Sequence, residues 1–503
     1  MNRKYFILLI IFLAALAAAV YVWSRGLDGP GLEVPVSSVQ NEETGGAVDL
    51  AAALEGFARD SFTGDLEGMI ERRMIRVLVT FNKTHYFVDQ GTQKGIYHEM
   101  FSVFEDELNA GLKNRHIRVN IVFIPVARDE LEEALIQGQG DVAAANLTIT
   151  PGRSEKVDFT DPLFTNVCEI VVTGPGAEPV NSVEDLSGKE VYIRKSSSFY
   201  ESLKELNKDF QDAGKMPVMV NAAPEVLETE DILEMVNAGL VEITIADSHL
   251  AEFWAQIFEN ITLHPEAAVK SGREIGIMIR KNSPELKQEL NEFLSAYREG
   301  TLERNVLLQK YLKNTRYARE MTSPEEMARF EAMVEIFRKY GDKYDLDHLL
   351  MMAQGYQESR LDQSARSPSG AIGVMQLLRS TGEEMDVGDI TQLEPNIHAG
   401  VKYVRFMIDH YFADEPMDEL NKGLMAMASY NAGPTRISRL RREAQERGLD
   451  PNIWFNNVEI VVAENIGRET VQYVSNVYKY YLAYTMIAEQ ARKRERVKSE
   501  KLL

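Results

Sequence analysis

The chain has 503 residues, which at about 150 residues per domain corresponds to roughly three domains. Its 45% hydrophobic and 26% charged residues are typical of a globular protein and exclude a disordered or collagen-like one. The formal net charge of −22 disfavours nucleic-acid binding, because an acidic surface repels phosphate backbones. The single cysteine, Cys168, excludes an internal disulfide, and the eight histidines show no metal-binding spacing, so we expect no metal and no other cofactor.

An apolar segment lies near the start of the chain. Residues 5–23 are nineteen consecutive apolar or aromatic residues that follow Arg3 and Lys4. A helix of that length spans about 28 Å, close to the roughly 30 Å hydrocarbon core of a bilayer. An uncleaved membrane anchor and a cleaved export signal both remain open, because Ala17–Ala19 offers a small-residue cleavage pattern; a buried core helix is the third alternative. Either of the first two predicts that the body of the protein is exported.

Residues 24–73 are predicted to be a spacer, rich in Gly, Pro, Ser and acidic residues up to residue 46 and with short helices beyond it. From residue 74 to 312, β-rich runs alternate with helical patterns, which predicts an α/β domain of two lobes built on parallel sheets. Ligands in such folds bind at the carboxyl ends of strands, so we expect a cleft between the lobes. The predicted strands are 75–81, 117–124, 142–145, 190–194, 241–246 and 274–280, and the predicted helices are 97–112, 129–137, 199–206, 232–238 and 284–302.

Four segments of this domain carry a resemblance. Residues 148–153 (Thr-Ile-Thr-Pro-Gly-Arg), followed by 157–162 (Val-Asp-Phe-Thr-Asp-Pro), resemble the signature of the family 3 solute-binding proteins. Residues 195–198 and 246–248 are similar to the other ligand-contacting stretches of that family. The resemblance implies the two-lobed fold of a periplasmic binding protein and a ligand such as an amino acid, a peptide or a muropeptide.

By position in these motifs, the resemblance implies that Arg153 and Thr150 bind a ligand carboxylate, that Ser197 assists at a helix N-terminus and that Asp247 binds an ammonium group. Arginine and helix N-termini both suit carboxylates. A surface ion pair is the alternative for Arg153. Residues 95–99 (Gly-Ile-Tyr-His-Glu) depart from the family, which often has an acidic pair after Gly-Phe here, so an altered ligand also remains open.

Beyond residue 312 the strand pattern stops and a mainly α domain, 313–490, is predicted. Ser323, Pro324 and Glu326 form a helix-start signal, in which Ser323 caps and Glu326 completes a capping box. A basic tail, 491–503, follows; a solvated helix end and a contact with anionic wall polymer or lipid are its two interpretations. The predicted helices are 324–340, 347–358, 396–411, 420–430, 435–447 and 469–488.

Four ordered motifs in this domain resemble the family 1 lytic transglycosylases, which have a goose-type lysozyme-like fold. The first joins Gln-Glu-Ser-Arg at 357–360 to the run 367–376, and the others lie at 396–403, 429–434 and 469–474. The resemblance implies cleavage of the β-1,4 bond between N-acetylmuramic acid and N-acetylglucosamine in peptidoglycan, with 1,6-anhydromuramyl ends. Glu358 is then the catalytic residue, first as acid and then as base.

The position of Glu358 supports this role. It falls in the last turn of a predicted helix with apolar neighbours, and both the negative helix end and burial should raise its pKa. Glycoside hydrolysis usually needs two carboxyl groups, and a lone carboxyl suits a reaction whose nucleophile comes from the substrate. Glu383, Glu384, Asp386 and Asp389 could supply a second carboxyl, although a solvated acidic loop is the alternative.

Five further residues are expected to bind substrate by their place in the motifs: Ser367, Gln376, Tyr430, Asn431 and Tyr473. Ser367 would bond near Glu358 or the acetamido group, Gln376 would contact sugar or support the loop, and the two tyrosines would flank the carboxyl. Plain core aromatics and, for Asn431, a cap or loop role are the alternatives.

One stretch departs from the family pattern. Residues 377–379 (Leu-Leu-Arg) replace the usual aliphatic-Met-Pro, which removes a methionine from the expected sugar face and a proline from a helix start. We therefore expect a somewhat altered sugar subsite with the catalytic role of Glu358 unchanged.

The sequence therefore predicts an exported lytic transglycosylase with a ligand-sensing domain, located in the cell envelope of a Gram-negative-type bacterium on the periplasmic face. It would be held by an inner-membrane anchor or attached peripherally to the outer membrane. Its partners would be peptidoglycan strands and a small ligand, with no nucleic acid. Two rivals remain open: a catalytically silent exported amino-acid or peptide receptor, and a hydrolytic muramidase that releases reducing ends.

Overall fold

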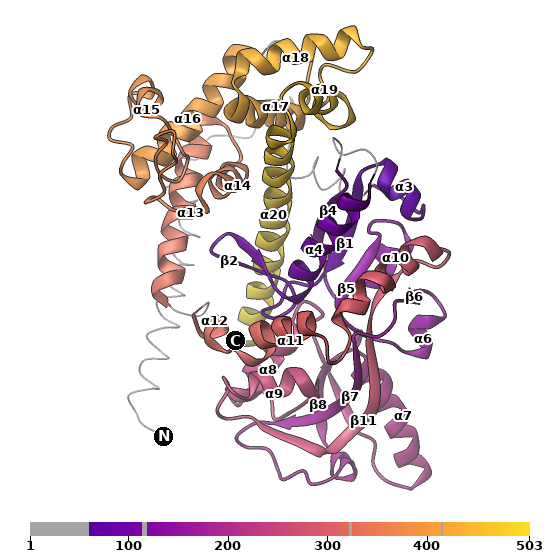
Figure 1. Cartoon of the computed structure of the whole chain (residues 1–503). Helices are drawn as coiled ribbons and strands as arrows, with labels where there is room; N and C mark the ends of the chain where they lie inside the picture. The colour runs from indigo at the N-terminus through magenta and orange to yellow at the C-terminus, as the bar shows by residue number, and fades with distance from the viewer. Residues whose placement is uncertain (1–59, 113–117, 321–323, 414–415, 503) are drawn as a thin grey trace, which may run out of the picture. The chain divides into compact units, whose positions relative to one another are not determined.

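The computed structural model describes residues 60–112, 118–320, 324–413 and 416–502 (Figure 1). The chain divides into two compact units, 1–46 and 47–503, and the described residues belong to the second. The predicted apolar segment 5–23, most of the spacer and the capping serine at 323 lie outside the described residues. Within the described ranges, no helix is both long and apolar enough to cross a membrane.

The first domain is built on a mixed sheet with the strand order β10-β7-β11-β5-β1-β4, in which β6 also pairs with β11. Strand β1 is parallel to β4 and β5, whereas β11 is antiparallel to β5, β6 and β7. Two smaller pairs accompany the sheet: β8 with β9, parallel, and the hairpin of β2 and β3. The strands are β1 Met74–Val79, β2 Phe87–Asp89, β3 Thr92–Lys94, β4 Asn120–Pro125, β5 Val142–Thr148, β6 Asp158–Phe159, β7 Phe164–Thr173, β8 Glu190–Arg194, β9 Met219–Ala223, β10 Ile243–Asp247 and β11 Thr262–Ile279.

The predicted two-lobed α/β domain is confirmed, but the prediction of purely parallel sheets is wrong. We call the part built on β1, β4 and β5 the first lobe and the part that carries β8, β9 and α8 (Thr229–Asn237) the second lobe. The long strands β7 and β11 pair antiparallel over most of their length within one sheet, which also includes β10. Hydrophobic patterns identify strands without giving their direction, which is set by pairing far along the chain. The helices of this domain are α3 Leu66–Glu71, α4 Ile96–Gly111, α5 Leu131–Ile136, α6 Pro151–Ser154, α7 Ser198–Asp212, α8 Thr229–Asn237, α9 Ser248–Trp254, α10 Pro284–Leu294, α11 Leu302–Leu308 and α12 Arg316–Glu320.

The end of the predicted spacer packs on the first lobe. Leu66 and Met69 of α3 are buried in the core of that lobe. The carboxylate of Asp65 accepts hydrogen bonds from the backbone N–H groups of Leu66, at the start of α3, and of Glu285 and Leu286, at the start of α10. A carboxylate is favourable at a helix N-terminus, so Asp65 joins two helix starts.

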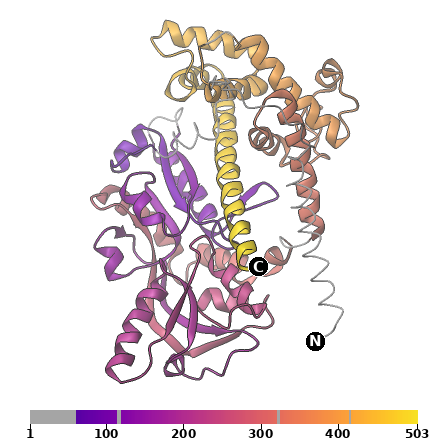
Figure 2. The same cartoon turned by 180° about the vertical axis from the view of Figure 1, so that it is seen from behind.

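The second domain is helical, and all six predicted helices are present. Two short helices, α15 and α19, were not predicted, because seven residues are too few to show a helical period. The last helix, α20, runs without a break into the predicted basic tail, and Figure 2 shows it from behind in yellow. The helices are α13 Pro324–Tyr344, α14 His348–Ser359, α15 Arg379–Met385, α16 Leu393–Tyr411, α17 Glu419–Ala432, α18 Pro434–Glu446, α19 Glu459–Asn465 and α20 Arg468–Leu502.

One buried carboxylate holds three arginine side chains beside the neighbouring strands β1 and β5. Asp141, directly before β5, is fully buried and accepts a hydrogen bond of 2.7 Å from the backbone N–H of Arg76 in β1. The Arg76 guanidinium contacts both carboxylate oxygens, at 3.1 and 3.3 Å, and Arg72 and Arg280 form further ion pairs with the same group. Three guanidinium groups therefore depend on one carboxylate.

We expect Asp141→Asn to lower the free energy of unfolding by about 3–5 kcal/mol, because it leaves buried arginine charge without its counter-ion. Urea denaturation followed by intrinsic fluorescence measures the change. Asp158→Asn is the matched control, since its side chain is 40% exposed and lies 3.7 Å from Lys281; we expect it to cost less than about 1 kcal/mol. Equal effects of the two substitutions would contradict the assignment.

Candidate active site and solute cleft

Helix α14 carries the candidate catalytic acid and has clear signals at both ends. The carboxylate of Asp347 caps its start, accepting from the backbone N–H groups of Leu349 at 2.8 Å and Leu350 at 3.4 Å. The helix ends at Arg360 and Leu361, whose left-handed backbone (φ 58° and 61°) turns the chain away. Glu358 consequently lies in the last turn, as the sequence predicted.

Glu358 is partly buried and has one hydrogen-bond donor among the described side chains. The Tyr473 hydroxyl, from α20, donates to Glu358 Oε1 at 2.6 Å. Burial raises the pKa of Glu358 to about 7, against the opposing effect of that hydrogen bond. The direction of the shift agrees with the prediction and has burial, one of its two predicted causes, behind it; no carboxylate of the described residues contributes to it.

Tyr430, near the end of α17, lies close to the same carboxyl without bonding to it. Its hydroxyl donates to the backbone carbonyl of Met375 at 2.6 Å, and its ring meets that of Tyr403 edge-on, with centroids 5.5 Å apart. Burial raises the pKa of Tyr430 well above its ordinary value, and the negative charge of Glu358 adds to the rise. Tyr430 and Tyr473 therefore both lie in the electrostatic environment of Glu358.

Ser367 and Gln376 are engaged within the loop that follows α14. The Ser367 hydroxyl accepts from the backbone N–H of Ala371 at 3.0 Å and shares a 2.8 Å hydrogen bond with Ser369. The Gln376 amide donates to the carbonyl of Gly373 at 2.8 Å, and Gln376 itself has a positive φ of 44°. Both side chains support the loop conformation in this structure.

Asn431 joins two helices at the edge of this region. It is exposed, and its Oδ1 accepts a 2.7 Å hydrogen bond from the hydroxyl of Thr470, near the start of α20. The four acidic residues at 383, 384, 386 and 389 are all exposed. The cluster is solvated, as in one of its two interpretations, but Glu383 and Glu384 lie in helix α15 and not in a loop.

Two polar side chains of this region were not predicted as functional. Asn396 is fully buried in α16; its Oδ1 accepts from the backbone N–H of Met375 at 2.8 Å, and its Nδ2 donates to two loop carbonyls at 2.9 and 3.0 Å. Gln354 is also fully buried and lies one turn before Glu358. Neither of its amide atoms has a hydrogen-bond partner among the described residues, but Gln354 is close enough to Tyr473 to oppose the rise that burial causes in the pKa of that hydroxyl. A glutamine four residues before Glu358 on an otherwise apolar helix face was the available signal.

In the first domain, residues of both lobes line a cavity of about 20 Å³, room for about one water molecule. Of the four predicted ligand residues, Arg153, Ser197 and Asp247 line it. Thr150 does not; its hydroxyl caps α6 by accepting from the backbone N–H of Arg153 at 3.3 Å. The lobes are closed on each other around this cavity.

The predicted carboxylate-binding groups are already engaged. The Arg153 guanidinium donates to the carbonyls of Thr148 at 2.8 Å and Ser196 at 2.9 Å, and so connects the lobes. The Ser197 hydroxyl donates to the carbonyl of Arg194 at 2.6 Å. A ligand carboxylate would have to replace these contacts.

Asp247, the predicted ammonium partner, is buried with one oxygen satisfied. Its Oδ2 accepts from the Asn146 amide at 2.8 Å, while Oδ1 has no hydrogen-bond partner among the described residues. Burial, with a smaller effect of Glu169, raises the pKa of Asp247 to about 7. The described residues contain no group of three His, Cys, Asp or Glu placed to hold a metal ion.

We expect Asn396→Ala to destabilise the second domain, because it leaves the buried N–H of Met375 and two loop carbonyls without partners. The cost should be about 2 kcal/mol or more, which lowers the Tm by about 4–8 °C in a domain of this size. Differential scanning calorimetry measures the shift. Asn465→Ala, at the exposed end of α19, is the control and should leave the Tm within about 1 °C; an equal shift would contradict the role given to Asn396.

The comparisons with known proteins match both domains. The family described as "Transglycosylase SLT domain" matches residues 335–453, and the family described as "Bacterial extracellular solute-binding proteins, family 3" matches residues 75–314. A solved structure, the ancestral amino acid-binding protein AncCDT-1, a precursor of cyclohexadienyl dehydratase, is 23% identical, with a TM-score of 0.39, and covers 49% of this chain and 99% of its own.

Curated relatives extend over both domains. The membrane-bound lytic murein transglycosylase F of Desulfosudis oleivorans is 28% identical over 81% of this chain and 89% of its own length. The protein of the same name from Shewanella woodyi is 26% identical over 84% of this chain and 87% of its own. The chain therefore matches the model of the family 3 solute-binding proteins in its first domain and that of the transglycosylase SLT domain in its second, and it is similar over most of its length to proteins named membrane-bound lytic murein transglycosylase F.

Proposed function

We propose that this protein is a lytic transglycosylase that cleaves the β-1,4 bond between N-acetylmuramic acid and N-acetylglucosamine in peptidoglycan and leaves 1,6-anhydromuramyl ends. The observation that carries the proposal is the Glu358 carboxyl: partly buried, with a pKa of about 7, and bonded by one hydroxyl donor. The transglycosylase domain and the names of the relatives support the same substrate.

One carboxyl is enough for this reaction. Hydrolysis by either usual route needs a second carboxyl, to activate water or to attack the sugar. In the proposed reaction, protonated Glu358 donates its proton to the glycosidic oxygen, and the bond to the N-acetylglucosamine breaks. The 6-hydroxyl of the muramyl sugar then attacks its own anomeric carbon and gives its proton to the Glu358 carboxylate. The carboxyl ends as it began, and no water is consumed.

The surroundings of Glu358 suit both of its roles. A pKa of about 7 leaves a large share of the group protonated near neutral pH, so that it can act as an acid. After it has lost its proton, the Tyr473 hydroxyl stabilises the carboxylate through the 2.6 Å hydrogen bond. The same group is then a stronger base than an ordinary exposed glutamate.

In this proposal the five expected substrate residues have different roles, some beside Glu358 and others in the surrounding loop and at the edge of the site. Tyr473 orients Glu358 through its hydrogen bond. Tyr430 fixes the backbone carbonyl of Met375 by donating a hydrogen bond to it. Ser367 and Gln376 hold the loop against which the sugar would lie, and Asn431 shapes the edge of the site. The two loop side chains would meet sugar only by exchanging their present hydrogen bonds.

The first domain is proposed to bind an amino acid, a peptide or a muropeptide and to modulate the catalytic domain. Its cavity lined by Arg153, Ser197 and Asp247 supports this assignment. The protein is proposed to be membrane-associated in the cell envelope, at the periplasmic face, because its relatives are named membrane-bound and the segment 5–23 is apolar. The rival of a silent receptor is not favoured, because the relatives of the whole chain are transglycosylases by name.

We expect Glu358→Gln to reduce cleavage of purified peptidoglycan by about 100- to 10,000-fold, because it removes the acid and the base. Mass spectrometry of the digest tests the reaction itself: products lighter by one water have anhydro ends. Glu383→Gln, a change at an exposed glutamate of helix α15, is the control and should leave the rate unchanged. Reducing ends would indicate a muramidase, and no products from the unaltered protein would indicate a receptor; either would overturn the proposal.

The pH dependence gives an independent test. Because Glu358 must be protonated to act first, kcat/KM should fall as the pH rises through about 7. Tyr473→Phe removes a hydrogen bond that lowers the pKa of Glu358, so this limb of the profile should move to higher pH while the rate falls. Tyr411→Phe, at the end of α16, serves as the control with an unshifted limb. A shift to lower pH in Tyr473→Phe would contradict the assignment.

A further inference from the structure

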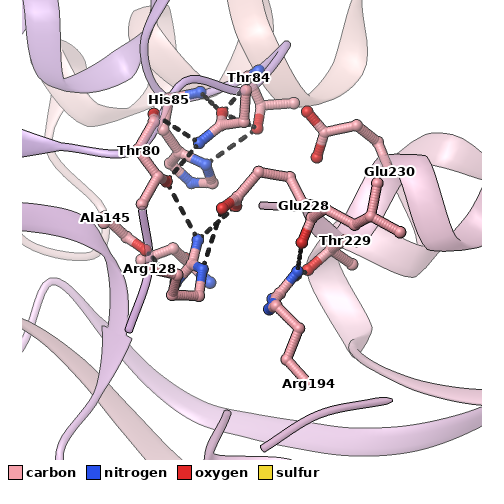
Figure 3. Close-up of polar contacts among 12 residues, drawn as sticks. Thr80, Thr84, His85, Arg128, Ala145, Arg194, Glu228, Thr229 and Glu230 are labelled. Carbon is pink, nitrogen blue, oxygen red and sulfur yellow. Dashed lines mark hydrogen bonds and ion pairs between the residues drawn. The ribbon is translucent and has the colours of Figure 1, made fainter. Parts of the chain in front are cut away.

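A buried ion pair crosses the cleft of the first domain (Figure 3). Arg128, from the loop after β4, belongs to the first lobe, and Glu228, directly before α8, belongs to the second. Arg128 Nε lies 3.2 Å from Glu228 Oε1, and one terminal nitrogen lies 2.5 Å from Oε2. The two side chains are only 9% and 4% exposed. This paired arrangement is the geometry by which arginine binds a free carboxylate.

The rest of the Arg128 guanidinium is held by the first lobe. It donates to the carbonyl of Ala145 at 2.8 Å and to the hydroxyl of Thr80 at 3.3 Å. These contacts orient the guanidinium toward the cleft without involving the second lobe. Arg128 is therefore pre-arranged to receive a carboxylate at the position that Glu228 now occupies.

The other two arginines that line the cavity are used differently. Arg153 donates to two backbone carbonyls, as described above. Arg194, in the second lobe, donates to the carbonyl of Leu227 and, at 3.5 Å, to the hydroxyl of Thr229. Of these three lining arginines, Arg128 is the one that forms an ion pair in the described part of the chain, and its partner carboxylate belongs to the chain itself.

The space between the lobes is too small for a ligand in this state. A cavity of about 20 Å³ holds about one water, so even a small amino acid requires the lobes to separate. Separation breaks the Arg128–Glu228 pair and exposes both groups to water or to a ligand. Among the described residues, other contacts across the cleft are hydrogen bonds, such as Ser198 to Thr148 at 3.1 Å and the backbone N–H of Lys83 to Glu230 at 2.5 Å.

We propose that Arg128 is the carboxylate-binding residue of this cleft, and that Glu228 is an internal carboxylate that occupies it and holds the lobes together until a ligand carboxylate takes its place. The inference rests on the proposed ligand-binding role of this domain. It specifies the ligand as a molecule with a free carboxylate, and it assigns the recognition to Arg128 where the sequence resemblance implied Arg153.

Hydrogen exchange of the full-length chain, read by mass spectrometry, tests the internal contact without any ligand. Glu228→Gln keeps the shape of the side chain and can still cap α8, but it removes the charge. We expect the backbone amides of 198–200 and 229–231, on the second-lobe side of the cleft, to exchange at least about tenfold faster than in the unaltered protein. Arg128→Lys breaks the paired geometry from the other side and should give the same signature.

The matched control is Glu205→Gln, which breaks an exposed ion pair with Lys270 elsewhere in the second lobe, where the side chains are 64% and 44% exposed. Its cleft amides should exchange at the unaltered rate. Unchanged exchange in Glu228→Gln and Arg128→Lys would overturn the proposal. Faster exchange in the Glu205→Gln control as well would overturn it too, because the effect would not belong to the buried pair.

Acetate is the probe for the second half of the proposal, with chloride at the same ionic strength as the control salt. In Glu228→Gln the second-lobe side chain paired with Arg128 is no longer a carboxylate, so acetate should slow cleft exchange back toward the unaltered rate and chloride should not. An equal effect of the two salts would overturn the assignment of a carboxylate site. Peptidoglycan cleavage by the same preparations depends on Glu358, so failure of this inference is distinguishable from failure of the proposed catalysis.

Discussion

The hydrogen bond between Tyr473 and Glu358 is the contact on which the proposed chemistry depends. It joins the end of α14 to α20. Among the described residues, Tyr473 is the hydrogen-bond donor to this partly buried carboxyl. Burial raises the pKa of Glu358 and this hydrogen bond lowers it. The effect of burial is the larger, so Glu358 is near the midpoint of its titration at neutral pH. Two other polar contacts of the region help to position that carboxyl. Asp347 begins the helix that carries it, and Asn396 holds the loop that passes beside it.

Local features of the catalytic domain could be predicted from the sequence. The extent of α14 and the direction of the pKa shift of Glu358 were predicted from the hydrophobic pattern and the apolar neighbours of Glu358, all within a dozen consecutive residues. The contact partners of Ser367 and Gln376 could not be predicted, because the positive φ of Gln376 and the turn around Ser367 set which atoms their side chains reach. Their roles toward sugar remain predictions.

In the solute-binding domain, contacts between distant parts of the chain could not be predicted from the sequence. Its strands and helices were recognisable, but the antiparallel pairing of β7 with β11 was not, since strand direction depends on chain segments far apart. Arg128 and Glu228 lie one hundred residues apart, outside every recognised motif, and meet only because the lobes close. Arg153 was recognisable from its motif, yet its guanidinium is occupied by backbone carbonyls. Sequence motifs indicate which residues a family uses, and the structure determines which of them are engaged by the chain itself.

Helix α14 is fastened to α20 at both of its ends. Tyr481 donates to the carboxylate of Asp347 at the start of α14, and Tyr473 donates to Glu358 near its end. Two tyrosines of α20 therefore fix the axial position of α14 relative to α20. A sliding of α20 by one turn, about 5.4 Å, would have to break both bonds together. The position of the Glu358 carboxyl therefore depends on the axial position of α20, a helix that continues to Leu502.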